Sequence, residues 1–335
     1  MTVRVYSSLD TGAPALSGDF YDRLRTILKA CLVDGYGAQP AAGWSLIHDV
    51  TGGFSLTNGD GIINFVRQAV YDVRVYIMES VTDGSSALAE GVNRRSAAWY
   101  DGSASAERFN LYGAMLAVGS NPHWVVVADD KSCIWSASGN ITTADQTTDG
   151  NAFAHYFGNY VNALGLAGAA AFCCLGGNKS VGGSGQKLGH GDGRFGMALR
   201  NPFTGVIEQG VDARYGASAP IHTRGGSSWF VQSVPLIQTT RLIPVRAGLM
   251  CYGAGLNGTT SPTAQALAGY LRGLIVEPVL CGALLSQVLG FFSLPNVWQG
   301  RVQIINVPTG PGWVPVFRTN NDAGFFASLD PADWE

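Results

Sequence analysis

The sequence predicts a mainly β protein, folded as a β-sandwich or jelly-roll-like unit or as a barrel. The prediction includes one N-terminal amphipathic helix and long glycine-rich loops. Three observations support this class: many short β-prone segments are separated by turn residues, one stretch alone has a convincing helical period, and nine glycines fall within residues 176–196. Short strands at such spacing are typical of sandwiches and barrels rather than of alternating β and α units.

The N-terminal elements are a strand, a turn and a helix. Residues 2–6 alternate as a short strand, and residues 9–14 are rich in turn formers. In residues 19–33 the apolar side chains recur at helical spacing and form one face. That face comprises Phe20, Leu24, Ile27, Leu28, Cys31 and Leu32. The polar side chains Asp22, Arg23, Arg25 and Lys29 lie off it. We expect the helix to pack on a sheet, with Ser17 or Asp19 as its N-cap and Gly35 at its end.

The strands follow from alternation and turn chemistry. Residues 62–66 and 71–78 are expected strands, the second with Val73, Val75 and Ile77 on one face. Residues 124–128 and 133–136 flank the polar turn formed by Asp129, Asp130 and Lys131, which predicts a hairpin. Further strands are expected at residues 169–175, 230–234, 241–246, 273–281, 301–307 and 313–317. A second, weaker helix is expected at residues 262–270, which are rich in Ala and Leu.

The chain divides into an N-terminal β-rich domain, residues 1–140, and a C-terminal β-rich region, residues 141–335, unless both belong to one continuous domain. The glycine-rich segment, residues 176–196, lies in the second region. Glycine loses much backbone freedom on ordering, so this segment is expected to be a long loop. In an assembling protein such a loop would order against a neighbouring subunit.

Motifs that suggest chemistry lack their structural context. Residues 191–196 match GxGxxG by letter, but no strand–turn–helix unit surrounds them. Residues 177–180 resemble a phosphate-binding loop, but Asn178 replaces the glycine before Lys179. Asp129 and Asp130 are adjacent in a turn, so by themselves they do not form the facing carboxylate pair of a glycosidase.

The histidines also lack the spacing of metal ligands on one element. They are His48, His123, His155, His190 and His222. Weak chelation by His190 with Asp192 is the alternative to an ordinary polar loop. The sequence therefore predicts no catalytic, cofactor-binding or metal-binding residues, and a protein that is not an enzyme.

The charge content is low for a soluble domain. Charged residues make up 13% of the chain and hydrophobic residues 46%, where an average domain has about 25% charged residues. The only lysines are Lys29, Lys131, Lys179 and Lys187, and arginine, which is favoured at interfaces, supplies the other basic residues. We expect partners to cover much of the surface, although a neutral Ser, Thr, Asn and Gly surface is the alternative.

Two classes of partner are not expected. A net charge of −3 without a basic stripe argues against nucleic-acid binding. The absence of any run of 18 apolar residues argues against membrane insertion. The first ten residues lack the pattern of a leader peptide, so we expect synthesis and folding in a cytoplasm.

Cysteine and tryptophan each allow several interpretations. The six cysteines, Cys31, Cys133, Cys173, Cys174, Cys251 and Cys281, show no CxxC spacing. Buried free thiols are the ordinary interpretation, and disulfides between subunits are the alternative. Trp124 and Trp135 are expected to pack across paired strands, and Trp313 and Trp334 are expected to anchor an interface. A third interpretation is that exposed aromatic side chains form a platform for glycans.

Several segments of the first half resemble one group of proteins. Residues 6–14 (YSSLDTGAP), 30–37 (ACLVDGYG), 41–44 (AAGW), 73–80 (VRVYIMES) and 124–130 (WVVVADD) are similar to segments of virion structural proteins of tailed bacteriophages. Residues 271–273 and 294–295 are weaker similarities. The resemblance covers less than half of the chain, and it weakens after about residue 140. It implies a particle component in the tail or its attachments, with no known reaction and no catalytic residues.

The function expected from resemblance and composition is structural. The leading hypothesis is a subunit of the phage tail machinery, in the baseplate, tail tip, collar or neck, which acts by self-assembly. Its expected partners are copies of itself and other phage structural proteins, and its expected location is the virion, after synthesis in the bacterial host cytoplasm. Alternatives are a capsid decoration or vertex protein, an adhesin that binds a host surface glycan, and an envelope-degrading enzyme.

Overall fold

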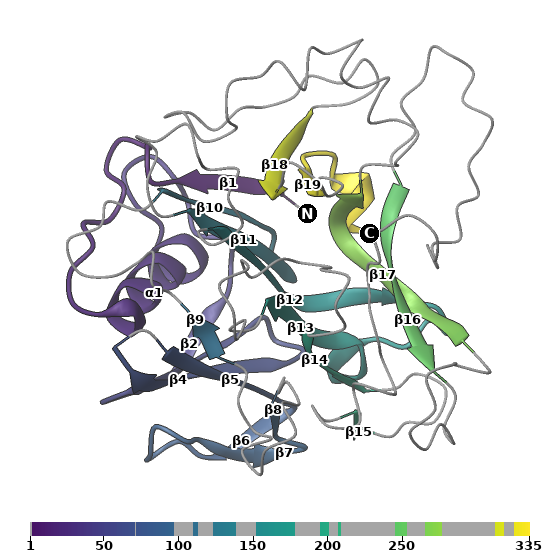
Figure 1. Ribbon diagram of the computed structural model, residues 1–335, viewed down its shortest axis with the longest axis horizontal. Helices are drawn as coiled ribbons and strands as arrows, with labels where there is room; N and C mark the ends of the chain where they lie inside the picture. The colour runs from purple at the N-terminus through teal and green to yellow at the C-terminus, as the bar shows by residue number, and fades with distance from the viewer. Residues whose placement is uncertain are drawn as a thin grey trace.

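The computed structural model describes residues 2–70, 72–96, 110–112, 123–138, 152–177, 195–200, 207–208, 245–252, 265–276, 312–317 and 325–335. In these residues the protein is mainly β, with a single α-helix and two large antiparallel sheets (Figure 1). The predicted β class is therefore confirmed. Among the described residues, no helix is long and apolar enough to cross a membrane.

The helix α1 (Phe20–Lys29) begins and continues as its sequence predicts. Asp19 is the N-cap, and it forms a reciprocal capping box with Asp22. A π-helical turn, η1 (Ala30–Asp34), extends the helix to Gly35, whose φ of 77° ends it. All six side chains of the predicted apolar face are fully buried.

One polar residue of this helix departs from the prediction. Arg23 was expected to lie off the buried face, but only 5% of it is exposed. Its guanidinium folds back toward the start of the helix, where Nε donates to the carbonyl oxygen of Gly18 at 3.2 Å. The long aliphatic stem of arginine can be buried in this way while its polar end finds a backbone acceptor.

The smaller sheet is built almost entirely from residues 45–96. Its strand order is β2–β3–β4–β5–β8, and β9 pairs with the same edge of β5. These strands are β2 (Ser45–Val50), β3 (Gly53–Thr57), β4 (Ile62–Ala69), β5 (Asp72–Met78), β8 (Arg95–Ser96) and β9 (Asn110–Tyr112). Val73, Val75 and Ile77 lie on the buried face of β5, as alternation predicts.

The larger sheet contains eleven strands and curls strongly. Its main path is β1–β10–β11–β12–β13–β14–β15, and β16 to β19 extend it through a second pairing between β12 and β17. The strands of the path are β1 (Arg4–Ser7), β10 (His123–Ala128), β11 (Ser132–Ser138), β12 (Ala152–Asn162), β13 (Phe172–Gly177), β14 (Phe195–Arg200) and β15 (Ile207–Glu208). The extension contains β16 (Val245–Tyr252), β17 (Gln265–Val276), β18 (Trp313–Phe317) and β19 (Phe325–Ser328).

Two short 3₁₀ turns occur among the described residues: η3 (Gly168–Ala171) precedes β13, and η4 (Pro331–Trp334) follows β19.

The main core lies between helix α1 and the inner faces of the two sheets. Helix α1 contributes Leu24 and Ile27, the smaller sheet contributes Phe54 and Phe65, and the larger sheet contributes Trp124 among other residues. The rings of Phe54 and Phe65 stack with centroids 4.8 Å apart, which fixes the register of adjacent strands through side chains as well as through the ladder. The helix therefore packs against β-sheet, as expected.

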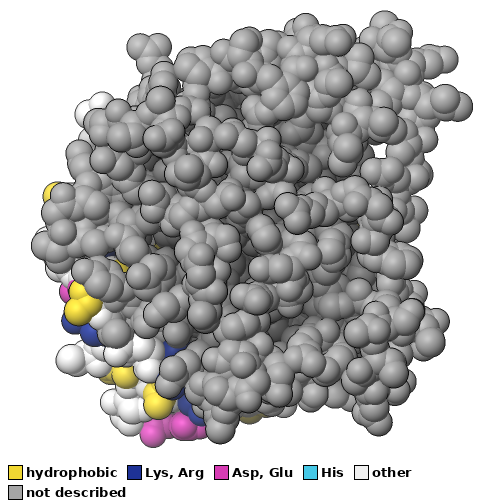
Figure 2. All heavy atoms as spheres, in the orientation of Figure 1, with side chains coloured by type: hydrophobic (Ala, Val, Ile, Leu, Met, Phe, Trp, Pro, Cys, Tyr) yellow, Lys and Arg dark blue, Asp and Glu magenta, His cyan; other side chains and the backbone are white. Residues whose placement is uncertain are grey.

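A short hairpin covers the outer face of the smaller sheet. It consists of β6 (Ser80–Asp83) and β7 (Glu90–Val92). Ala89 from the hairpin packs on a small apolar cluster that includes Tyr76 and Met78. The Asn64 side chain donates to the Ala87 carbonyl at 3.2 Å, and His48 Nε2 lies 3.0 Å from the Ser86 carbonyl. The hairpin thus covers part of the outer face of this sheet, and its own outward side chains lie at the lower left edge of the surface in Figure 2.

Several predicted strands are confirmed, and others lie outside the described residues. Strands cover residues 62–66, most of 71–78, 124–128, 133–136 and 313–317, and the Asp129–Lys131 turn closes the predicted hairpin. The expected strand at 169–175 begins later, because a 3₁₀ turn occupies residues 168–171. Residues 230–234, 301–307, 241–244 and 277–281 lie outside the described part.

The predicted helix at residues 262–270 is wrong. Residues 265–276 form the strand β17, which pairs with β12, β16 and β19. The Ala and Leu content favoured a helix, but tertiary pairing outweighs this weak propensity. The end of this strand also differs from helical backbone, since Gly273 has a φ of 67°.

The ends of the glycine-rich segment, residues 176–196, are also strands rather than loop. Gly176 pairs with Gly196 and Gly177 pairs with Phe195, so β13 and β14 approach each other as neighbouring strands. The residues between them, 178–194, lie outside the described part. The larger sheet also joins strands from both halves of the chain, and the division at residue 140 stays a prediction.

Candidate functional site

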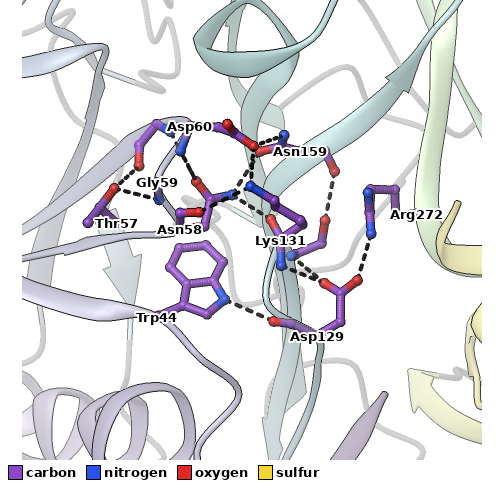
Figure 3. A network of polar contacts seen from close by, with 11 residues as sticks. Trp44, Thr57, Asn58, Gly59, Asp60, Asp129, Lys131, Asn159 and Arg272 are labelled. Carbon is purple, nitrogen blue, oxygen red and sulfur yellow. Dashed lines mark hydrogen bonds and ion pairs between the residues drawn. The ribbon is translucent and has the colours of Figure 1, made fainter. Parts of the chain in front are cut away.

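A polar network connects four parts of the fold and is the candidate site (Figure 3). It combines the β3–β4 loop, the β10–β11 turn, β12 and β17, and Trp44, which lies directly before β2, joins these four parts through its indole. Its labelled residues are Trp44, Thr57, Asn58, Gly59, Asp60, Asp129, Lys131, Asn159 and Arg272. The sequence gives no hint of this grouping, because Asp129 and Arg272 are 143 positions apart.

The β3–β4 loop is shaped by its own side chains. The Asn58 side-chain oxygen accepts from the backbone N–H groups of Asp60 at 2.9 Å and Gly61 at 3.0 Å. The Thr57 hydroxyl accepts from Gly59 N–H and donates to the Gly61 carbonyl. Such Asx and hydroxyl turns fix a loop before any distant contact forms.

The Asn58 amide then connects this loop to the opposite sheet. Its nitrogen donates to the Lys131 carbonyl at 2.6 Å and to the Asn159 side-chain oxygen at 2.7 Å. The Asn159 amide nitrogen in turn donates to Asp60 at 2.8 Å, and Lys131 Nζ lies 2.7 Å from the same carboxylate. Loop, turn and strand are therefore held together by side chains with matched donors and acceptors.

A buried ion pair forms the other half of the network. Arg272 on β17 donates to the Asp129 carboxylate at 2.6 Å, and the Asp129 side chain is fully buried. Asp129 also accepts from the backbone N–H groups of Lys131 at 2.9 Å and Ser132 at 2.6 Å. The Trp44 indole donates to the Asp129 carbonyl at 3.0 Å. One residue thus receives donors from three separate elements.

Burial and ion pairing shift the pKa values of Asp129 and Asp60 in opposite directions, and the balance differs between the two carboxylates. Burial raises the pKa of Asp129, and Arg272 with the two backbone amides opposes that shift. At Asp60 burial also raises the pKa, but hydrogen bonds from Lys131 and Asn159 outweigh it, so the pKa is below its usual range. Each carboxylate is already engaged by a cation of the chain, and the arrangement is suited to fixing elements in place.

A metal site is not found in the described part of the chain. No group of three or more His, Cys, Asp or Glu side chains lies together there. His190 and His222 lie outside the described residues, as does Asp192. The position next to the Asp60 carboxylate where a cation would bind holds the Lys131 ammonium.

His155 lies in the core instead of in a site. Its ring stacks on Trp135 with centroids 5.4 Å apart. Burial lowers the pKa of His155 to about 3, so the ring is neutral at ordinary pH. The described end of the GxGxxG match does not fit a dinucleotide-binding motif, because Phe195 and Gly196 belong to the strand β14, whereas such a motif opens a helix. Residues 178–180 of the phosphate-loop-like segment lie outside the described part.

The tryptophans whose side chains the structure describes pack inside the chain, and the side chain of Trp313 lies outside that part. Trp124 and Trp135 are 1% exposed in paired strands, which confirms the expected cross-strand packing. Trp334 was expected to anchor an interface, and that prediction is wrong. It is fully buried against Gly273, and its indole donates to the Ser328 carbonyl at 2.8 Å. Because these rings are enclosed, they cannot form a platform for a glycan.

The cysteines whose side chains the structure describes are buried thiols outside any disulfide. They are Cys31, Cys133, Cys173 and Cys174. This confirms the ordinary interpretation for these four, and both adjacent thiols are buried although they point to opposite faces of β13. Cys281 lies outside the described residues, and the side chain of Cys251 is not described.

The segments that carry the sequence resemblance meet in space. The Tyr36 hydroxyl donates to Asp10 at 2.8 Å and accepts from Ser7 N–H at 3.1 Å. The Tyr36 ring lies edge-on to Trp124 with centroids 6.3 Å apart. A Cβ on Gly37 would lie 2.5 Å from the Thr11 carbonyl oxygen, so this contact requires glycine. Residues from three of these segments, 6–14, 30–37 and 124–130, therefore pack against one another.

Comparison with known proteins assigns no family. Neither a scan against protein-family models nor a search of curated proteins found a match to this chain.

Proposed function

We propose that this protein is a structural subunit of a tailed-phage virion, most simply in the tail machinery, and that it acts by self-assembly. The observation that carries the proposal is the similarity of residues 6–14, 30–37, 41–44, 73–80 and 124–130 to phage virion structural proteins. Baseplate, tail tip, collar and neck are the sites that such a role includes.

The packing of these segments supports the proposal, because residues that resemble one protein group also contact one another in the fold. Their contacts are core contacts and backbone-directed hydrogen bonds, as between Tyr36, Asp10 and Ser7. The choice of residue at one of these positions limits the choice at the others, because a substitution leaves a buried donor or acceptor unpaired.

Composition gives independent support. A chain with 13% charged residues and four lysines among its 21 basic residues has the charge pattern of a surface that meets other subunits. The ion pairs of Asp129 with Arg272 and of Asp60 with Lys131 hold the loops of such a subunit in place through contacts within the chain.

The test is the location of the protein in purified particles. Antibodies against the recombinant chain, coupled to gold, should label virions at one symmetric site on the tail, and quantitative mass spectrometry should give a small fixed copy number. Labelling over the head with hundreds of copies would instead establish a decoration protein. Absence from washed particles would overturn the proposal.

A further inference from the structure

The β3–β4 loop contains a chemically reactive dipeptide, Asn58–Gly59. In such a sequence the backbone nitrogen of the glycine can attack the side-chain carbon of the asparagine, because glycine has no side chain to hinder the approach. The shape of the loop requires both residues. Gly59 has a φ of 87°, and Asn58 offers an acceptor and a donor in one side chain.

The Asn58 amide is enclosed, and both of its polar atoms are engaged (Figure 3). Only 8% of Asn58 is exposed. Its Oδ1 accepts from the backbone N–H groups of Asp60 and Gly61, and its Nδ2 donates to the Lys131 carbonyl at 2.6 Å. Nδ2 also donates to the Asn159 side-chain oxygen at 2.7 Å. Because backbone N–H groups only donate and carbonyl groups only accept, these partners fix the orientation of the amide.

The attacking nitrogen is engaged as well. The Gly59 N–H donates to the Thr57 hydroxyl at 3.0 Å, and a hydrogen-bonded N–H gives up its proton to solvent base only after the bond opens. Ring closure would also move Cγ of Asn58 to the Gly59 nitrogen and withdraw the side chain from its partners on the larger sheet. The native contacts therefore oppose the reaction at both nitrogens.

We propose that Asn58 is a deamidation site that the native fold protects, and that its reaction disconnects the β3–β4 loop from the larger sheet. The Gly59 nitrogen loses its proton to solvent base and forms a bond to Cγ of Asn58. The Cγ–Nδ2 bond breaks, and Nδ2 takes up a proton and leaves as ammonia. Water then opens the cyclic imide at one of its two C–N bonds, which leaves aspartate or isoaspartate at position 58. This proposal is independent of the proposed virion role.

Either product lacks the amide donor that joins the loop to the larger sheet. A carboxylate oxygen in place of Nδ2 would face the Lys131 carbonyl and the Asn159 side-chain oxygen, which both accept hydrogen bonds. It would also bring a second negative charge into the loop that carries Asp60, at a position that is nearly buried. Since water does not restore the amide, a transient opening of the loop would become a permanent loss of this connection.

The first experiment needs no variant, because the chain contains a second Asn–Gly dipeptide, Asn257–Gly258, as an internal reference. The full chain is incubated in mildly alkaline buffer with and without guanidinium chloride, and peptide mass spectrometry follows deamidation at both positions. In denaturant the two asparagines should react at similar rates. In the folded chain Asn58 should react at least about ten-fold more slowly than in denaturant, because the reaction then requires local opening.

Equal rates at Asn58 in the folded and the denatured chain would overturn the proposal. A faster reaction in the folded chain would also overturn it, since it would show that the two N–H groups on Oδ1 activate the amide as an oxyanion hole does.

The second experiment changes the protecting contacts. Thr57→Val removes the acceptor of the Gly59 N–H with little change in volume, and Asn159→Ala removes one acceptor of Asn58 Nδ2. Each should raise the rate at Asn58 several-fold under conditions where near-UV circular dichroism shows a folded chain. The matched control is Thr26→Val, which removes a hydroxyl of helix α1 and should leave the rate unchanged. No acceleration in either variant would contradict protection by these contacts.

The third experiment tests the consequence of the reaction. Asn58→Asp reproduces one of the two products and should unfold at a lower denaturant concentration than the wild type, because the connection to the larger sheet is lost. An unchanged midpoint would overturn the proposed disconnection of the loop.

Discussion

At the scale of single residues, the Asp129–Arg272 pair shows how burial changes the value of a charge. Arg272 is nearly buried, and the Asp129 side chain is fully so. The attraction within a buried pair is offset by desolvation, so the intact pair contributes little net stability. Removing one partner is different, since it leaves the other charge buried and uncompensated.

We therefore expect Arg272→Met to lower the free energy of unfolding by about 3–5 kcal/mol. Urea denaturation followed by circular dichroism measures this. The control is Arg272→Met/Asp129→Asn, which removes both charges and should be less destabilised than the sum of the two single changes. A loss below about 1 kcal/mol for Arg272→Met would mean that Asp129 is solvated after all.

His155 gives the fold a dependence on pH. Its pKa is about 3 in the folded chain against 6.5 for an unperturbed histidine, because burial disfavours the charged ring. The unfolded chain therefore binds a proton first as pH falls. The stability that neutral His155 provides is complete above pH 6.5 and declines from there toward pH 3.

The variant His155→Phe keeps an aromatic ring against Trp135 and removes the titration. Between pH 6.5 and about 4.5 the unfolding free energy of the wild type should fall by up to about 1.4 kcal/mol per pH unit more than that of the variant. Asp60, whose pKa is below its usual range, contributes its loss only at lower pH. Parallel curves for the two proteins in this window would contradict a buried neutral His155.

At the scale of elements, helix α1 shows that a local signal can leave one choice open. Both Ser17 and Asp19 can cap a helix, and the sequence alone does not decide between them. The structure shows Asp19 accepting from Asp22 N–H at 3.2 Å, and Ser17 is exposed. Asp19 also pairs with Arg67 at 3.1 Å, which connects the helix to β4.

We expect Asp19→Ala to cost about 1–2 kcal/mol of stability, from the lost cap and the weakened ion pair, whereas Ser17→Ala should be neutral. Thermal or urea denaturation of the two variants provides the comparison. Equal effects of the two changes would show that the cap is shared or placed differently.

Strands differ in how far their formation depends on the rest of the fold. The hairpin of β10 and β11 follows from its own alternation and its Asp129–Lys131 turn. Residues 265–276 would be helical by composition, and only pairing with three other strands makes them β17. The strands β2, β3 and β12 were not predicted.

At the scale of the whole molecule, buried thiols report on global unfolding. Burial raises the pKa of Cys31, Cys133 and Cys174, so the reactive thiolate is suppressed at each. Such thiols should react only when the core opens.

We predict that the folded variant Cys251→Ser/Cys281→Ser will hardly react with an aromatic disulfide reagent. After denaturation, four thiols per chain should react. Non-reducing and reducing gels of this variant should both give a monomer band. Rapid labelling without denaturant, or a dimer that reductant removes, would contradict the enclosed core. The wild type tests separately whether the two remaining cysteines link subunits.

Local sequence signals were sufficient to predict the β class, the helix with its buried face, and the hairpin around Asp129, because each depends on a local period or turn. Tertiary structure alone decided that Arg272 meets Asp129, that Asn58 and Asp60 meet Asn159, and that Trp334 is enclosed. The physical reason is that these contacts join residues from separate elements. No local pattern encodes which distant donor will satisfy a buried acceptor, and only the packed sheets bring the two within hydrogen-bonding distance.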